Sequence, residues 1–99
     1  MYVIQERNIL KKHIVKLKRA GLLKNYHRII DEIAKDPKSQ THHFEILERK
    51  ISKPSIFSKR LSKSHRVVYS IDVNHKSVTI FSAWGHYASG VHSLDQHKL

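Results

Sequence analysis

The spacing of apolar residues divides the chain into a helical first part and a strand-rich second part. Met1–Gln5 is short and partly β-branched, which predicts a first strand. From about Glu6 the apolar residues recur at helical spacing until Gly21, whose lack of a side chain favours the end of a helix. The apolar stripe of this first helix consists of Ile9, Leu10, Ile14 and Leu17, and Leu22 and Leu23 follow it.

A second helix is predicted after the Gly21 turn, because Tyr26, Ile29, Ile30 and Ile33 fall on one helical face. It should end before Pro37, since a proline disfavours the helical conformation of the residue before it. Two helices joined by so short a turn form a hairpin, and their apolar faces require a surface to cover.

Three strands are predicted in quick succession after a polar, irregular stretch from Lys38 to Ser55. They cover Ile56–Leu61, Arg66–Val73 and Ser77–Trp84, and the separators have hairpin length. The expected fold class is α+β, in the order β-α-α-β-β-β, with the helical hairpin packed on a twisted antiparallel sheet. We expect one domain over residues 1–87 and a C-terminal tail over residues 88–99.

Charge is the most pronounced feature of the composition. Nineteen lysines and arginines face eight acidic residues, for a formal net charge of +11. Such a field attracts polyanions, so the candidate partners are nucleic acid, an anionic membrane surface or an acidic protein. The alternative is a solubilising surface with no partner. With no cysteine, no long apolar run and no visible signal peptide, we expect a cytoplasmic protein that does not enter a membrane.

Nine histidines raise the question of a metal site. No His-Glu-x-x-His or related ligand spacing occurs, and the adjacent His42 and His43 would point opposite ways in an extended segment. We therefore expect solvated histidines, a few of them touching RNA, and neither a metal nor another cofactor.

The second half carries residues suited to RNA cleavage. Attack by the 2′-hydroxyl of RNA on its own phosphodiester needs a base, an acid and cations that hold the developing charge. The chain offers Glu45, then Lys59 and Arg60 on one strand, Arg66 at the start of the next, and His86-Tyr87 after the last. In a meander the start of the middle strand lies beside the ends of its neighbours, so these groups can converge although they are distant in sequence.

Each candidate also has a simpler interpretation. Glu45 fits a surface carboxylate, Arg66 fits the decoration of a strand edge, and His86 fits a polar loop. Tyr69 and Trp84 fit core or interface aromatics better than platforms for stacking bases. The pattern alone leaves a non-catalytic, basic RNA-binding module open beside a ribonuclease.

The second half also resembles a known family. The motifs that carry the resemblance are Phe-Glu-Ile-Leu-Glu at 44–48, Phe-Ser-Lys-Arg-Leu at 57–61, Ser-His-Arg-Val-Val-Tyr-Ser-Ile at 64–71 and Phe-Ser-Ala-Trp-Gly-His-Tyr at 81–87. They are similar to the Txe/YoeB toxins of the RelE-like superfamily. The resemblance implies a microbial-RNase-like fold and metal-independent cleavage of mRNA in the ribosomal A site.

The same resemblance implies a role for each matching residue. Glu45 falls on the general base, His86 on the general acid and Arg66 on the arginine that stabilises the phosphate. Arg60 matches a further basic residue, and Tyr87 matches a tyrosine that orients the substrate. The implied partners are a cognate antitoxin of the Phd/YefM type, mRNA and the ribosome. The sequence itself leaves a homodimer open. We also expect basic residues to contact RNA phosphates. They are Lys59 and Arg60 in the second motif and Lys11, Lys12, Lys16 and Lys18 in the first helix.

This chain departs from the family pattern after Tyr87, where the family generally ends at or just after the His-Tyr pair. We expect residues 88–99 to cross the mouth of the active site, to contact the ribosome or antitoxin, or to have no role.

Overall fold

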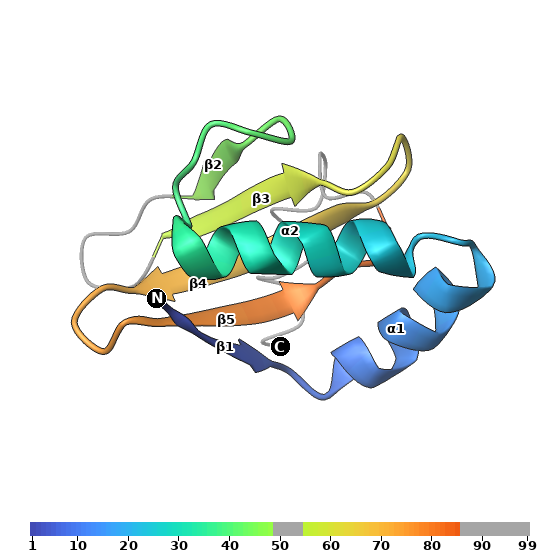
Figure 1. Ribbon diagram of the computed structural model, residues 1–99, viewed down its shortest axis with the longest axis horizontal. Helices are drawn as coiled ribbons and strands as arrows, with labels where there is room; N and C mark the ends of the chain where they lie inside the picture. The colour runs from blue at the N-terminus through green and yellow to red at the C-terminus, as the bar shows by residue number, and fades with distance from the viewer. Residues whose placement is uncertain (49–54, 86–99) are drawn as a thin grey trace.

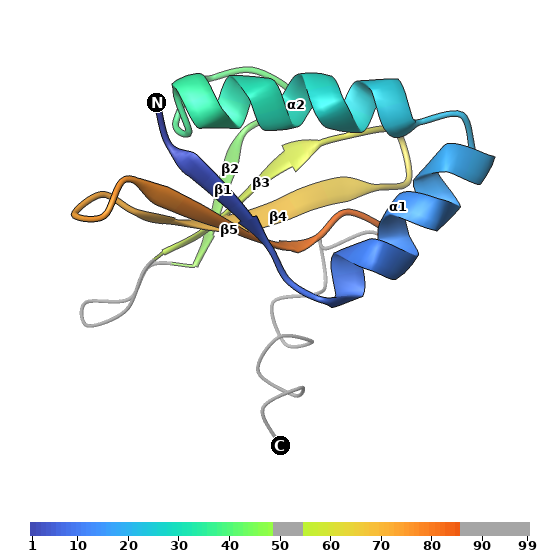
Figure 2. The ribbon, with the colours of Figure 1, turned by 60° about the horizontal axis from the view of Figure 1, so that its bottom comes forward.

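A computed structural model describes residues 1–48 and 55–85. In chain order its elements are β1 (Val3–Glu6), α1 (Ile9–Arg19), α2 (Leu23–Lys35), β2 (Glu45–Glu48), β3 (Ile56–Arg60), β4 (Arg66–Asp72) and β5 (Ser77–Ser82). The strands form one five-stranded sheet in the order β1-β5-β4-β3-β2. α2 lies across one face of this sheet, and α1 lies beside the sheet, near the ends of β1 and β5 (Figures 1 and 2).

The α+β class and the helical hairpin on a sheet are confirmed, and so is the meander β3-β4-β5, in which both pairs are antiparallel. The sheet differs from the expected one in two respects. β1 joins β5 in parallel, so the sheet is mixed. β2 adds a strand inside the stretch predicted to be irregular, and it pairs with β3 in antiparallel fashion.

The first helix begins later than its apolar spacing suggests. Pairing of β1 with β5 extends to Glu6, and the backbone N–H of Arg7 still donates to the Ile80 carbonyl at 3.1 Å. α1 therefore starts at Ile9 instead of near Glu6. At its other end the chain turns through Gly21, whose φ of +74° is readily adopted only by glycine.

The core forms between α2 and the sheet. The predicted face of α2 is confirmed, because Tyr26, Ile29 and Ile33 are buried and Ile30 packs against them. Opposite this face the sheet contributes alternate residues from each central strand, as the period of two requires. These buried sheet residues are Phe57, Val67, Tyr69, Ile71, Val78 and Ile80.

Candidate active site

The end of the sheet near α1 brings three segments together. Arg60 ends β3 and Arg66 begins β4, and the two residues are cross-strand partners. The backbone N–H of Arg66 donates to the Gly85 carbonyl at 3.1 Å, so the chain leaving β5 also reaches this point. In Figure 1 the arrowheads of β3 and β5 flank the start of β4. The described residues thus meet at one end of the sheet, as the meander predicts.

The register places the candidate side chains on the face without helices. Glu45 pairs with Ser58, and Arg60 pairs with Arg66. Phe57 alternates with Ser58 and belongs to the core under the helices, so Ser58 and its cross-strand neighbours face the other way. Figure 2 shows that α2 covers the opposite face of the sheet, and that α1 lies beside the end of the sheet. The candidate side chains therefore lie on the face that α2 leaves uncovered.

Arg66 is the centre of the cluster. Its Nε donates to Ser58 Oγ at 2.9 Å, and its Nη2 donates to the His43 carbonyl at 2.9 Å. The same Nη2 lies 3.2 Å from Glu45 Oε1. The Arg66 side chain is only 4% exposed, whereas that of Glu45 is 56% exposed. The guanidinium is thus held by Ser58 and the His43 carbonyl, and the Glu45 carboxylate beside it remains exposed to solvent.

Burial is the main influence on the charge of Arg66. It lowers the pKa of the guanidinium, while Glu45 raises that pKa and the neighbouring Arg60 lowers it further. An arginine titrates so far above neutrality that it stays cationic despite such a shift. Arg60 and Arg66 therefore place two positive charges on adjacent strands, which is an arrangement suited to a phosphate.

A left-handed turn presents the backbone groups that hold this cluster. His42 and His43 have φ values of +54° and +52°, so the segment is not extended as the sequence argument assumed. The His42 carbonyl accepts from the Arg60 N–H, and the His43 carbonyl accepts from Arg66. Two successive non-glycine residues in this conformation are each unfavourable by roughly 1–2 kcal/mol. The surrounding contacts must therefore impose the turn.

Lys59 is one source of these contacts. It is fully buried, and its Nζ reaches two residues of the loop before β2: the Ser39 carbonyl at 2.7 Å and Oγ at 3.0 Å, and the Thr41 carbonyl at 3.1 Å and Oγ1 at 3.0 Å. Burial lowers the pKa of Lys59, and Glu32 and Asp36 oppose that shift. The expectation that Lys59 contacts RNA therefore does not fit this conformation, because its three N–H groups point into the protein.

Glu32 ties the same loop to α2. Its carboxylate accepts from the Thr41 hydroxyl and lies 2.7 Å from His42 Nε2. The Thr41 hydrogen bond is the largest influence that lowers the pKa of Glu32, and His42 and Lys59 add to it. The α2–β2 loop is thus held by a carboxylate on one side and an ammonium on the other.

The lysines of α1 lie on a separate element from the arginine pair. All four are exposed, and α1 has no acidic residue in its first turn. Lys16 reaches the segment that follows β5, with its Nζ 5.9 Å from the centre of the Trp84 ring. These predicted RNA-contacting residues are Lys11, Lys12, Lys16 and Lys18.

Several expectations fall on residues outside the described ranges. His86 and Tyr87 follow directly after Gly85 and lie beyond residue 85, as does the whole of 88–99. Among residues 1–48 and 55–85, no three side chains of the metal-ligating types gather into a site. No helix in the same ranges is long and apolar enough to cross a membrane.

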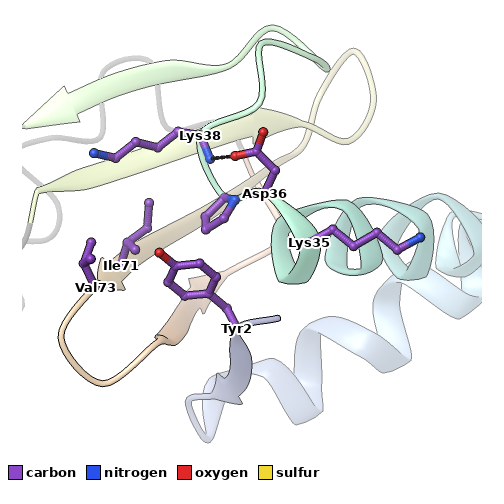
Figure 3. A pocket seen from close by; sticks show the side chains of 7 residues that line it. Tyr2, Lys35, Asp36, Lys38, Ile71 and Val73 are labelled. Carbon is purple, nitrogen blue, oxygen red and sulfur yellow. Dashed lines mark hydrogen bonds between the residues drawn. The ribbon is translucent and has the colours of Figure 1, made fainter.

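A small pocket lies at the opposite end of β4 from Arg66 (Figure 3). It sits between the end of α2 and the end of β4, and at its rim the Lys38 N–H donates to Asp36 Oδ1 at 3.3 Å. The pocket is therefore separate from the arginine cluster. Its walls are Tyr2, Lys35, Asp36, Pro37, Lys38, Ile71 and Val73.

Sequence reasoning missed two groups that position Arg66. Ser58 lies inside a motif that was recognised, but a serine between Phe57 and Lys59 gives no signal of its own. The His43 carbonyl is a backbone group and leaves no mark in the sequence. The strand register alone points to Ser58, because it places this residue diagonally across from Arg66.

The sequence matches no protein-family model and no curated protein. The fold, in contrast, matches solved structures. A YoeB/ParE toxin from Agrobacterium tumefaciens aligns with a TM-score of 0.72 at 16% identity, covering 86% of this chain and 99% of that one. An archaeal RelE, solved as a RelE–RelB complex from Pyrococcus horikoshii, gives 0.68 at 16% identity, covering 85% and 93%.

Structures of YoeB from Staphylococcus aureus are also similar. Its dimer aligns with a TM-score of 0.70 at 18% identity, covering 87% of this chain and 98% of that one. Its complex with YefM aligns with a TM-score of 0.66 at 20% identity, covering 88% and 99%. At these identities the comparison establishes architecture. The chain has the fold of the YoeB and RelE toxins.

Proposed function

We propose that this chain is the toxin of a type II toxin–antitoxin pair and inhibits translation by cutting mRNA at the ribosome. The observation that carries the proposal is the contact between Arg66 and Glu45 on the open face of the sheet. A buried, fixed guanidinium beside an exposed carboxylate supplies a phosphate-binding cation next to a proton acceptor. The fold shared with the YoeB and RelE toxins supports the same conclusion.

The proposed reaction breaks one phosphodiester bond without a metal. Glu45 removes the proton of the 2′-hydroxyl, whose oxygen then attacks the adjacent phosphorus. Arg66 and Arg60 stabilise the additional negative charge on the phosphoryl oxygens. His86 protonates the departing 5′-oxygen, and Tyr87 orients the substrate. The products are a 2′,3′-cyclic phosphate and a free 5′-hydroxyl.

The exposed lysines of α1 are assigned to binding, because they belong to an element that does not contribute to the arginine pair. Contacts to phosphates position a nucleic acid without reading its sequence. We assign Lys11, Lys12, Lys16 and Lys18 to ribosomal or messenger RNA. Each phosphate contact that is lost should weaken binding and reduce its dependence on salt.

An antitoxin is the proposed protein partner. The similar structures include a complex of RelE with RelB and a complex of YoeB with YefM. For this chain we propose a Phd/YefM-type antitoxin with an acidic segment, which the net charge of +11 would attract. A homodimer is a second proposed assembly, since YoeB from Staphylococcus aureus forms one. Both assemblies would form in the cytoplasm, where the ribosome is.

Mapping of mRNA ends in a translating extract tests the nuclease. The wild-type chain should produce new mRNA ends, and the double variant Glu45→Ala, His86→Ala should produce at least about 10²-fold fewer, because it lacks both proton-transfer groups. Arg28→Lys is the control, since Arg28 is exposed on α2, away from the cluster. Undiminished cleavage by the double variant would show that the catalytic assignment is wrong.

A non-catalytic inhibitor that binds the ribosome by charge is the second candidate, and the exposed lysines of α1 favour it. It predicts arrested translation without new mRNA ends, and full inhibition by His86→Ala. Under this candidate, Lys12→Glu combined with Lys16→Glu should relieve inhibition about tenfold or more, because each change also reverses a charge near the RNA. Measuring inhibition and mRNA ends in the same extract separates the two candidates.

A further inference from the structure

Two histidines converge on the short segment that follows β5. Their partners are alternate backbone N–H groups: Ala83 donates to His13 Nδ1 at 3.1 Å, and Gly85 donates to His65 Nδ1 at 2.8 Å. His13 lies on α1, whereas His65 lies just before β4. The segment is therefore held from two sides by side chains that are far apart in sequence.

Trp84 stands between the two anchored residues. Its ring stacks on His65 with the ring centres 3.9 Å apart and the planes inclined by 23°. Lys16 Nζ lies 5.9 Å from the centre of the same ring. Ala83 is completely buried, so its N–H group would be left without water if the imidazole moved away. The backbone and the side chain of this segment are thus both fixed.

Accepting a hydrogen bond at Nδ1 requires that this nitrogen carry no proton. The surroundings of His13 favour that state, because burial, followed by the charge of Lys16, lowers the pKa of its imidazole. Both hydrogen bonds hold backbone N–H groups shortly before residue 86, in the segment whose Gly85 carbonyl accepts from Arg66.

We propose that His13 and His65 are positioning residues that hold the Ala83–Gly85 backbone, whose Gly85 carbonyl accepts from Arg66, and so fix the point from which the chain continues to residue 86. The role in catalysis rests on the proposed function, in which residue 86 is the general acid. A displacement of about 1 Å in a catalytic group can lower a rate about 10²-fold. Hydrogen bonds at both Ala83 and Gly85 restrict such a displacement, whereas one hydrogen bond alone would let the segment rotate about it.

Variants at His65 separate the hydrogen bond that its Nδ1 accepts from Gly85 from the stacking of its ring on Trp84. His65→Phe retains a ring against Trp84 and loses the acceptor, whereas His65→Asn places an oxygen near the former Nδ1 and loses the ring. At His13, the corresponding pair is His13→Leu and His13→Asn. His75→Phe is the matched control, because His75 is 80% exposed and pairs with Asp72 at the far end of β4.

Amide hydrogen exchange measures the hold directly. His65→Phe should speed exchange at Gly85, and His13→Leu at Ala83, by about three- to tenfold each. The asparagine variants and the control should exchange like the wild type. Emission from Trp84, the sole tryptophan, should shift in His13→Leu if the segment moves as a unit. Unchanged exchange in both acceptor-free variants would overturn the proposal.

Cleavage measurements test the consequence for catalysis. The acceptor-free variants should lower kcat by about tenfold or more and leave KM within about twofold, and the asparagine variants should recover most of kcat. Faster exchange with an unaltered kcat would overturn the positioning role. Absence of cleavage by the wild-type chain would reject the proposed function, and the exchange rates would still decide whether the imidazoles hold the segment.

Discussion

Replacing Arg66 with lysine is expected to lower the rate of mRNA cleavage about 10²–10³-fold, although the positive charge is kept. Arg66 uses Nε for Ser58 and Nη2 for the His43 carbonyl and Glu45. An ammonium on a flexible stem cannot reproduce this planar fork. The expected loss therefore comes from orientation, and it should appear in single-turnover rates on programmed ribosomes.

The control for this prediction is Arg28→Lys, an exposed position on α2 where the same change should leave the cleavage rate within about twofold. A second comparison uses Ser58→Ala, which removes one hydrogen bond to Arg66 and should have a smaller effect of about two- to tenfold. Full activity in Arg66→Lys would show that charge alone suffices at this site and that the fixed geometry has no catalytic role.

The spacing of apolar residues predicted the helices and the meander because each of these elements buries one face against the rest of the protein. The face of α2 follows from residues spaced three and four apart, and tertiary contacts bury that face. The predicted convergence of Arg60 and Arg66 follows from topology, since two strands joined by a tight turn must place their adjoining ends together. Properties of this kind depend on few residues close in sequence.

β2 escaped prediction because its pairing with β3 creates it. The strand covers only Glu45–Glu48 in a polar stretch, where charged side chains alternate poorly with apolar ones. The left-handed turn at His42 and His43 was missed for a related reason, since two adjacent histidines do not predict a positive φ at either position. Lys59 and Glu32, which are distant in sequence, hold the loop that contains this turn.

The role of Lys59 illustrates the limit of reading charge from sequence. A lysine next to an arginine on a basic strand resembles a phosphate contact, and β-strand alternation decides otherwise. Arg60 points to the open face with Arg66, so Lys59 must point to the other face, toward the loop after α2. The alternation of strand residues could be read from the sequence. The backbone carbonyls of Ser39 and Thr41, which accept from the ammonium, could not.

Lys59→Met is accordingly expected to lower the free energy of unfolding by about 2 kcal/mol, as measured by urea denaturation. Methionine fills most of the space but leaves the Ser39 and Thr41 carbonyls without their donor. Lys63→Met is the matched control, because Lys63 is exposed in the turn before β4 and the change should have little effect. An unchanged denaturation midpoint in Lys59→Met would contradict the role of Lys59 in holding the loop before β2.

The same variant should also lower the rate of mRNA cleavage by about tenfold, measured without denaturant at a temperature where the variant remains folded. Release of the loop removes the restraint on the His42–His43 turn, and the unfavourable φ values at both residues then favour relaxation. Relaxation withdraws the His43 carbonyl from Arg66 and shifts Glu45, which begins the next strand. A buried lysine that never meets the substrate would thereby control the distance between the carboxylate and the guanidinium.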